Sequence, residues 1–174
     1  VTLAFDDRHR RRIRLHTDKG EEILLDLPKA VAMAHGDGLR ISDGRWLAAC
    51  RTMQDGHVQL LASTDDGRTW QDRGSLTLPG QHPPHLAHLK DGRILLTYGI
   101  RNEGLYGVAA RFSDDAGNSW SAPRILVALE GATDGGYPSS TECEDGTIVT
   151  AYYANKVVAH RRYHMGVVRW QADA

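Results

Sequence analysis

The sequence predicts an all-β chain built from repeated antiparallel hairpins. Two eight-residue segments, 63–70 and 113–120, share the pattern S-x-D-x-G-x-x-W. An Asp-Gly pair followed by an apolar run occurs three times, with the pairs beginning at residues 43, 91 and 145. No long segment places its apolar residues at the i, i+3, i+4, i+7 spacing of an amphipathic helix. Turns and short strands therefore account for nearly all of the chain.

Composition excludes several classes of protein. The chain has 174 residues with 21 basic against 22 acidic side chains and a formal net charge of -1. This balance is typical of a globular domain and is unlike a disordered acidic tail or a basic nucleic-acid binder. Apolar runs stay far below the roughly 18 to 20 residues that span a bilayer. Cys50 and Cys143 are too few for a disulfide framework.

The first 40 residues do not share the repeat. Short strands are predicted over residues 1–5, 12–16 and 22–27, and residues 28–38 are predicted to form a connector. Five arginines lie between Arg8 and Arg14. Such a run can contact phosphates, but the near-neutral charge of the chain favours a solvated strand face.

From residue 41 onward the chain repeats one hairpin module. Each Asp-Gly pair predicts a turn, because Gly adopts positive φ at little cost and Asp bonds to neighbouring backbone amides. The strands that follow the three pairs are predicted at 46–50, 94–98 and 148–152, and their partners at 57–62, 106–112 and 163–169. A four-stranded sheet that recurs every 40 to 50 residues is typical of a β-propeller blade. Residues 41–173 therefore predict about two and a half blades.

The two octets and their flanking segments carry a family resemblance. Residues 85–101 (HLAHLKDGRILLTYGIR) and 136–153 (GYPSSTECEDGTIVTAYY) resemble the C-terminal blades of the sialidase-like Asp-box, or BNR-repeat, propellers. The resemblance covers about residues 40–172. It implies an exo-α-sialidase type of glycoside hydrolase, or a propeller fragment that binds carbohydrate.

The N-terminal segment resembles a second family. The strings VTLAFDDRHRRRIRL, ILLDLPKAV and GDGLR occur there in the order found in the N-terminal domain of the urease accessory nickel chaperone UreE. This resemblance covers about residues 1–45 and implies a cytosolic metallochaperone, whose metal-binding C-terminal domain and His-rich tail have no counterpart here. We therefore expect two units: a partial UreE-like β segment over residues 1–40, and sialidase-like blades over residues 41–174.

The sialidase resemblance implies candidate site residues. Tyr137 lies where that family has its tyrosine nucleophile, and Glu142 is the candidate to orient or activate it. Arg101, with Arg111 as second choice, is the candidate to bind a sugar carboxylate, because guanidinium groups match carboxylates. Each has a structural alternative: a packed turn for Tyr137, and a solvated surface position for Arg101 and Glu142. Ala109 stands where relatives often carry an arginine.

Regularly spaced histidines can indicate a metal site. His82, His85 and His88 are spaced three residues apart, which on a strand alternates faces, so a structural role is favoured. His160 and His164 offer only two ligands. We expect neither a metal nor another cofactor.

The two resemblances lead to a main functional expectation and an alternative. The main expectation is a sialidase-like hydrolase or carbohydrate-binding fragment whose catalytic set is incomplete, because the family's acid/base Asp lies in the opening blades. The alternative is a urease accessory metallochaperone for nickel delivery, or a non-catalytic interaction module. Expected partners are a sialic-acid-like glycan, a second copy that completes the propeller, or the urease apoprotein, and neither nucleic acid nor membrane. The start at Val1 leaves an upstream signal peptide open, so the compartment is undetermined, or cytoplasmic if the N-terminal resemblance governs.

Overall fold

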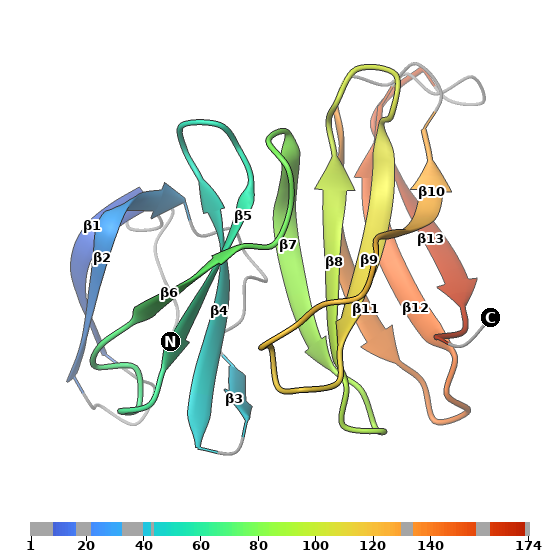
Figure 1. The fold of residues 1–174 in the computed structure, drawn as a ribbon. Coiled ribbons are helices and arrows are strands. Elements are labelled where there is room, and N and C mark those ends of the chain that lie inside the picture. The colour runs from blue at the N-terminus through green and yellow to red at the C-terminus, as the bar shows by residue number, and fades with distance from the viewer. Residues whose placement is uncertain are drawn as a thin grey trace.

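A computed structural model describes the backbone of residues 9–16, 22–32, 40–42, 44–129, 134–155 and 161–172, and side chains from residue 44 onward within these ranges. The described residues form strands and turns, with no helix (Figure 1). Accordingly, no helix in this part of the chain is long and apolar enough to cross a membrane. The predicted strand at residues 1–5 lies outside the described residues.

The first sheet combines the N-terminal hairpin with the first repeated module. Its hydrogen-bonded order is β1-β2-β4-β5-β6, and β3 also pairs with β4. The strands are β1 (His9–His16), β2 (Glu22–Ala32), β3 (Arg40–Ser42), β4 (Arg45–Thr52), β5 (Val58–Ser63) and β6 (Gln71–Ser75). Both β2 and β3 bond to β4, β3 near its beginning and β2 at Arg51 and Thr52.

The connector predicted at residues 28–38 is wrong in its first part, because β2 continues to Ala32. A connector is predicted from Pro28 because proline has no backbone N–H to donate to a neighbouring strand. The structure accommodates this proline because the β1–β2 register shifts between Arg10 and Arg12, opposite the segment that contains it. A proline is tolerated in a strand at such an irregularity.

The second and third sheets repeat the module without the hairpin. The second has the order β10-β9-β8-β7, and the third β11-β12-β13. Their strands are β7 (Gln81–His88), β8 (Ile94–Ile100), β9 (Gly107–Ser113), β10 (Arg124–Ala128), β11 (Gly135–Glu142), β12 (Ile148–Ala154) and β13 (His164–Trp170). Every pairing is antiparallel.

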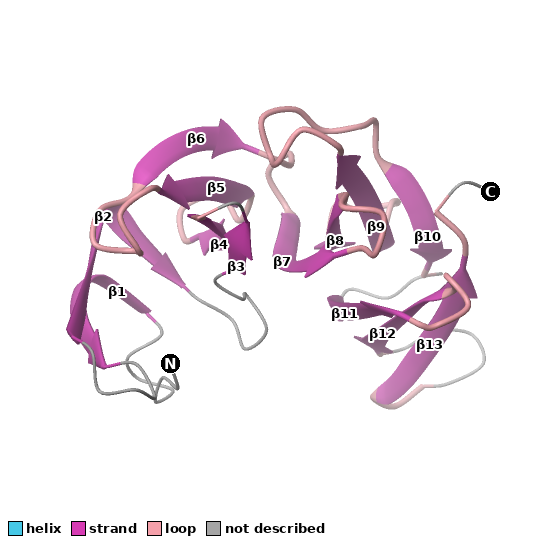
Figure 2. Cartoon of the chain, turned by 90° about the horizontal axis from the view of Figure 1, so that it is seen from below, coloured by secondary structure: helices cyan, strands magenta, loops and turns pink. Residues whose placement is uncertain are grey.

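The three sheets stand side by side in an open arc, with β7 and β11 toward its inner side (Figure 2). This arrangement confirms the predicted fold class: a partial β-propeller of two to three blades preceded by a short β segment. Two apolar layers hold the arc together. Between the first and second sheets lie Leu47, Leu60, Leu96 and Tyr98; between the second and third lie Leu95, Ala110, Ile148 and Trp170.

Both octets form the tight turn that the sequence predicts. In the first, the Asp65 carboxylate accepts hydrogen bonds from Ser63 Oγ (2.7 Å) and from the Thr69 backbone N–H (2.8 Å). Trp70 folds back so that its Nε1 donates to the Gly67 carbonyl at 3.0 Å. The second octet repeats the carboxylate bonds with Asp115, Ser113 and Ser119. Each turn therefore closes its hairpin with a local set of side-chain bonds.

Candidate functional site

Arg101 is the centre of a polar cluster at one end of the second and third sheets. It directly follows β8, and its backbone N–H donates to the Gly80 carbonyl at 2.8 Å. Its Nη2 donates to the Tyr153 hydroxyl at 3.2 Å and lies 3.7 Å from Asp134 Oδ1. Its Cζ lies 5.3 Å from the ring centroid of Tyr137. The structure thus brings together Arg101 and Tyr137, two of the residues predicted from the sequence.

Asp134 holds two tyrosines at this cluster. The Tyr153 hydroxyl donates to its Oδ1 at 2.5 Å, and the Tyr163 hydroxyl donates to its Oδ2 at 2.7 Å. These bonds lower the pKa of Asp134. Burial, together with the bond to Asp134, raises the pKa of Tyr153 to about 12. Near neutral pH the carboxylate is therefore an anion and the phenol keeps its proton.

His82 lies beside the same arginine, and Arg51 is close to it. Its side chain packs over Gly56, where an added Cβ would lie 2.7 Å from the imidazole Cδ2 and Nε2. Burial first, and then the positive charges of Arg51 and Arg101, lower the pKa of His82 to about 4. The residue is 6% exposed. His82 is therefore a neutral imidazole near enough to two arginines for their charges to affect it.

Three buried nitrogen atoms in this cluster have no hydrogen-bond partner among the described residues: Arg51 Nε, His82 Nδ1 and Arg101 Nε. Buried polar atoms are nearly always paired in folded proteins. Two guanidinium groups with unused N–H donors favour an anion with several acceptor atoms, such as a carboxylate. These unpaired nitrogens make the cluster a candidate site for an acidic group.

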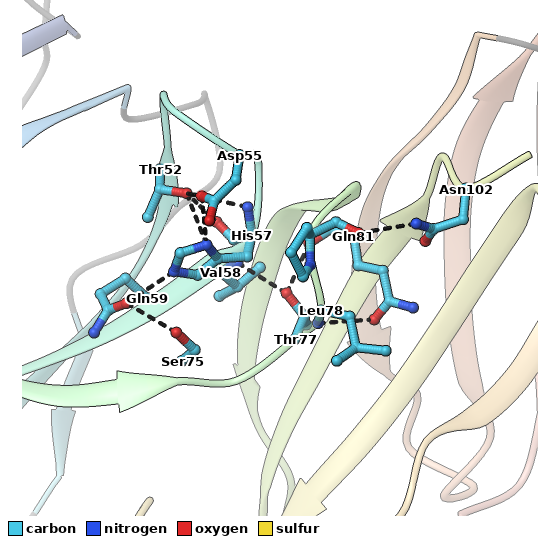
Figure 3. A network of polar contacts seen from close by, with 11 residues as sticks. Thr52, Asp55, His57, Val58, Gln59, Ser75, Thr77, Leu78, Gln81 and Asn102 are labelled. Carbon is cyan, nitrogen blue, oxygen red and sulfur yellow. Dashed lines mark hydrogen bonds and ion pairs between the residues drawn. The ribbon is translucent and has the colours of Figure 1, made fainter.

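A second network fixes the loop that carries Gly56 (Figure 3). His57 Nδ1 lies 2.7 Å from Asp55 Oδ1, and His57 Nε2 lies 3.0 Å from Gln59 Oε1. Thr52 Oγ1 also donates to Asp55 Oδ1 at 3.0 Å. These bonds hold the end of β4, and hence the backbone next to Arg51, against the loop below His82.

Tyr137 occupies an unusual backbone position. Its φ is 48°, and it follows Gly136 at φ 103° in a β-bulge of β11. A left-handed tyrosine is strained, and such strain is often found at functional sites. The ring is 43% exposed and lies 5.5 Å from that of Tyr153. The structure presents this phenol to solvent beside Arg101.

The other two predicted site residues lie elsewhere. Glu142 is at the opposite end of β11 from Tyr137, and its Oε2 accepts a hydrogen bond from the Lys90 backbone N–H at 2.6 Å. Arg111 donates to three backbone carbonyls, those of Leu76, Trp120 and Ser121. Neither joins the cluster around Arg101.

The cluster around Arg101 also contains residues that the sequence analysis does not single out. Arg51 ends the strand after the first Asp-Gly pair much as Arg101 follows the strand after the second, so the repeat itself contained a signal for it. Asp134 directly precedes β11 and Tyr153 lies near the end of β12, and neither belongs to a recognisable motif. Only the pairing of these strands reveals that they meet.

The histidines of the predicted H-x-x-H-x-x-H pattern have separate surroundings. His82 is affected by the charges of Arg51 and Arg101, while His85 Nδ1 accepts from the Ser140 backbone N–H at 3.3 Å. No group of three or more His, Cys, Asp or Glu side chains that could hold a metal ion occurs among the described residues. His160 lies outside them.

Comparison with known proteins finds a family similar to the N-terminal segment. Residues 1–50 match the N-terminal domain of the UreE urease accessory protein family. The UreE of Chelativorans sp. (strain BNC1) is 53% identical over 45 residues, which are 26% of this chain and 28% of that protein. The UreE of Rhodopseudomonas palustris (strain HaA2) is 51% identical over 89 residues, 51% of this chain and 33% of that protein. The chain thus spans about a third or less of the length of these relatives.

Solved structures similar to the whole chain include several carbohydrate-active enzymes. An α-L-arabinofuranosidase of Fusarium graminearum has a TM-score of 0.64 and 16% identity, with 91% of this chain and 53% of that chain covered. An endo-arabinase of Bacteroides thetaiotaomicron has a TM-score of 0.64 and 12% identity, covering 96% and 77%. A Dyadobacter fermentans protein of unknown function has a TM-score of 0.65 and 22% identity, covering 90% and 44%. At these identities the likeness establishes the propeller-type fold.

Proposed function

We propose that the chain is a sialidase-like propeller segment that binds a sugar bearing a carboxylate. The observation that carries this proposal is the group of unpaired buried nitrogens on Arg51, His82 and Arg101, beside the exposed ring of Tyr137. The two guanidinium groups would bind the carboxylate, and the neutral imidazole would add a polar contact without a third charge. The likeness to arabinose-releasing enzymes supports a carbohydrate as the ligand.

We propose Tyr137 as the residue that faces the anomeric carbon, in line with the tyrosine nucleophile of sialidases. A phenol needs a nearby base to react, and Asp134 is the carboxylate closest to this role, because it is ionised and bound to the neighbouring Tyr153. Glu142 is too far along β11 to serve Tyr137 directly. Binding is therefore the primary proposed activity, and hydrolysis is a separate question for experiment.

Calorimetric titration with N-acetylneuraminic acid and with its neutral analogue N-acetylmannosamine tests the binding proposal. We expect binding of the acid only. Arg51→Gln and Arg101→Gln should each weaken it about tenfold or more, since each removes a charge-assisted bond. Arg73→Gln, whose guanidinium bonds to Asn118 on the exposed surface, is the matched control. Equal affinity for acid and analogue would contradict the proposal.

A fluorogenic α-sialoside tests hydrolysis separately. If the chain turns over this substrate, Tyr137→Phe should abolish the turnover while sugar binding persists. Activity that survives in Tyr137→Phe would exclude Tyr137 as the nucleophile.

The match of residues 1–50 favours a second candidate function, in which this segment, as a unit of about residues 1–40, binds components of the urease system. Nickel titration and co-purification with urease apoprotein test it. Stoichiometric nickel binding at micromolar or tighter affinity, or a stable urease complex, would support this function. Absence of both would leave the segment as a structural part of the first sheet.

A further inference from the structure

We propose that Tyr137, Tyr153 and Tyr163 form a platform on which further sugar rings of an oligosaccharide stack. This inference rests on the proposed function, in which Arg51 and Arg101, hereafter the arginine pair, bind the acidic sugar. The three residues, hereafter the tyrosine row, belong to successive strands: Tyr137 to β11, Tyr153 to β12, and Tyr163 directly before β13. Adjacent ring centroids are 5.5 and 6.0 Å apart. The row therefore leads from Arg101 across the end of the third sheet.

The two end residues of the tyrosine row, Tyr137 and Tyr163, are exposed and Tyr153 between them is partly buried, although large aromatic side chains are usually well buried. Tyr137 is 43% exposed and Tyr163 65%. Contiguous exposed apolar area commonly marks a binding surface. The row is thus accessible to a ligand approaching the end of the sheet.

The outer two rings are held in place rather than free to rotate away. Tyr153 and Tyr163 donate to the two different oxygens of Asp134, and Arg101 donates to the Tyr153 hydroxyl. Neighbouring rings are tilted by 42° and 45°. A ligand that binds to rings already fixed in this way loses less conformational entropy on binding.

Sugar rings fit this surface better than a cation does. A pyranose has an apolar C–H face that packs on an aromatic ring and hydroxyl groups at its rim, which here would meet Asp134 and Arg101. A cation would also be attracted to aromatic rings. However, Arg101 already lies over Tyr137 and pairs with Asp134, so a second cation would meet a like charge.

The tyrosine row therefore predicts how affinity depends on ligand length. The arginine pair binds the acidic terminal sugar, and the next one or two rings cover Tyr153 and Tyr163. Affinity should rise from the monosaccharide to the trisaccharide, and the gain should depend on Tyr163, the outermost ring.

Calorimetric titration of the full chain with N-acetylneuraminic acid and with the trisaccharide sialyllactose tests this inference. We expect sialyllactose to bind at least about tenfold more tightly. Tyr163→Ala should remove most of this gain, so that the monosaccharide and the trisaccharide bind with nearly equal affinity. Tyr163→Phe, which keeps the ring and loses the bond to Asp134, should retain the gain. Ile125→Ala, at an exposed position on β10, is the control.

Tyr163→Leu provides a second variant in case the alanine variant misfolds, because it keeps apolar volume without a planar face. Circular dichroism checks the fold of each variant. Equal affinity for the monosaccharide and the trisaccharide, or an equal loss of both in Tyr163→Ala, would overturn the inference and leave the proposed function intact.

Failure of the proposed function can be distinguished from failure of the tyrosine row. If no acidic sugar binds, the proposed function fails. A neutral trisaccharide of arabinose that binds with a dependence on Tyr163 would then still support the tyrosine row. Absence of binding to all of these sugars would overturn both.

Discussion

His82 shows how a single residue can report on the whole polar cluster. Its pKa of about 4 lies below the usual value of 6.5, first because it is buried and then because Arg51 and Arg101 are near. A histidine that stays neutral in the folded state but takes up a proton when unfolded stabilises the fold fully above its unfolded pKa. That contribution is lost as the pH falls from about 6.5 to about 4.

We therefore expect the free energy of unfolding to fall by up to about 3 kcal/mol between pH 7 and pH 4 because of this residue. Urea denaturation at several pH values measures it. His82→Gln, which cannot take up a proton, should lack this component while other groups still titrate. An unchanged pH dependence in His82→Gln would contradict the prediction.

Ala116 has a backbone conformation that is unfavourable for a residue with a Cβ atom. It occupies the left-handed region at φ 57°, where the first octet has Asp66 at the same φ. An alanine there costs roughly 1 to 2 kcal/mol, and Asn tolerates the conformation better. Ala116→Asn should therefore raise the free energy of unfolding by about 1 kcal/mol, measured by urea denaturation. Ala122→Asn, at an exposed position without positive φ, should show no gain; a similar gain in both variants would refute the explanation.

Individual residues also show where sequence reasoning ends. Tyr137 and Arg101 were predicted because each sits in a recognisable string, and the structure places them together. Arg111 is predicted from its strand position, yet each nitrogen of its guanidinium donates to a backbone carbonyl. Asp134 carries no motif, and its importance arises from strand pairing that only the fold reveals.

At the scale of elements, the Asp-box turns are stabilised by an ionised carboxylate. Hydrogen bonds, first from the Ser119 hydroxyl and then from its backbone N–H, lower the pKa of Asp115 to about 2. A carboxyl whose pKa is lowered by folding stabilises the fold above its unfolded value of 3.8. This contribution disappears as the pH falls through about 2.

Asp115→Asn should lower the urea midpoint of unfolding at pH 7, because the amide cannot accept from Ser113 and Ser119 as the carboxylate does. The difference from the unaltered chain should narrow as the pH falls from about 4 toward 2. Asp114→Asn is the matched control, since no described residue donates a hydrogen bond to that neighbouring carboxylate. Equal effects of the two substitutions would contradict this account of the turn.

Elements were predictable where turn chemistry is local. The Asp-Gly pairs and octets depend on bonds within a few residues, so the hairpins of the second and third sheets follow from the sequence. The end of β2 did not, because it is fixed by pairing with β4, about twenty residues away. A local breaker such as Pro28 carries no information on that partner.

At the scale of the whole molecule, the third sheet leaves one face uncovered within the described residues. Along β13 exposure alternates: Met165 is 76% exposed and Val167 57%, while Val168 and Trp170 pack against the second sheet. No described strand bonds to the outer edge of β13. An apolar face beside a free strand edge favours self-association.

We expect sedimentation velocity to show a concentration-dependent dimer, consistent with the hypothesis that a second copy completes the propeller. Met165→Glu should shift the equilibrium toward the monomer, because it places a charge on the apolar face. Leu105→Glu, at an exposed turn residue, should leave association unchanged. A monomer at all concentrations of the unaltered chain would disprove the hypothesis.

The shared edge of β4 has a further consequence. The segment similar to UreE joins the blades through main-chain pairing at Val31 and Ala32 with Thr52 and Arg51, and peptide groups are the same in every sequence. This β2–β4 junction does not depend on which side chains are present. Hairpins of unrelated sequence could therefore replace one another here and keep the same backbone hydrogen bonds. Arg51, one of the two arginines of the candidate site, lies in this pairing.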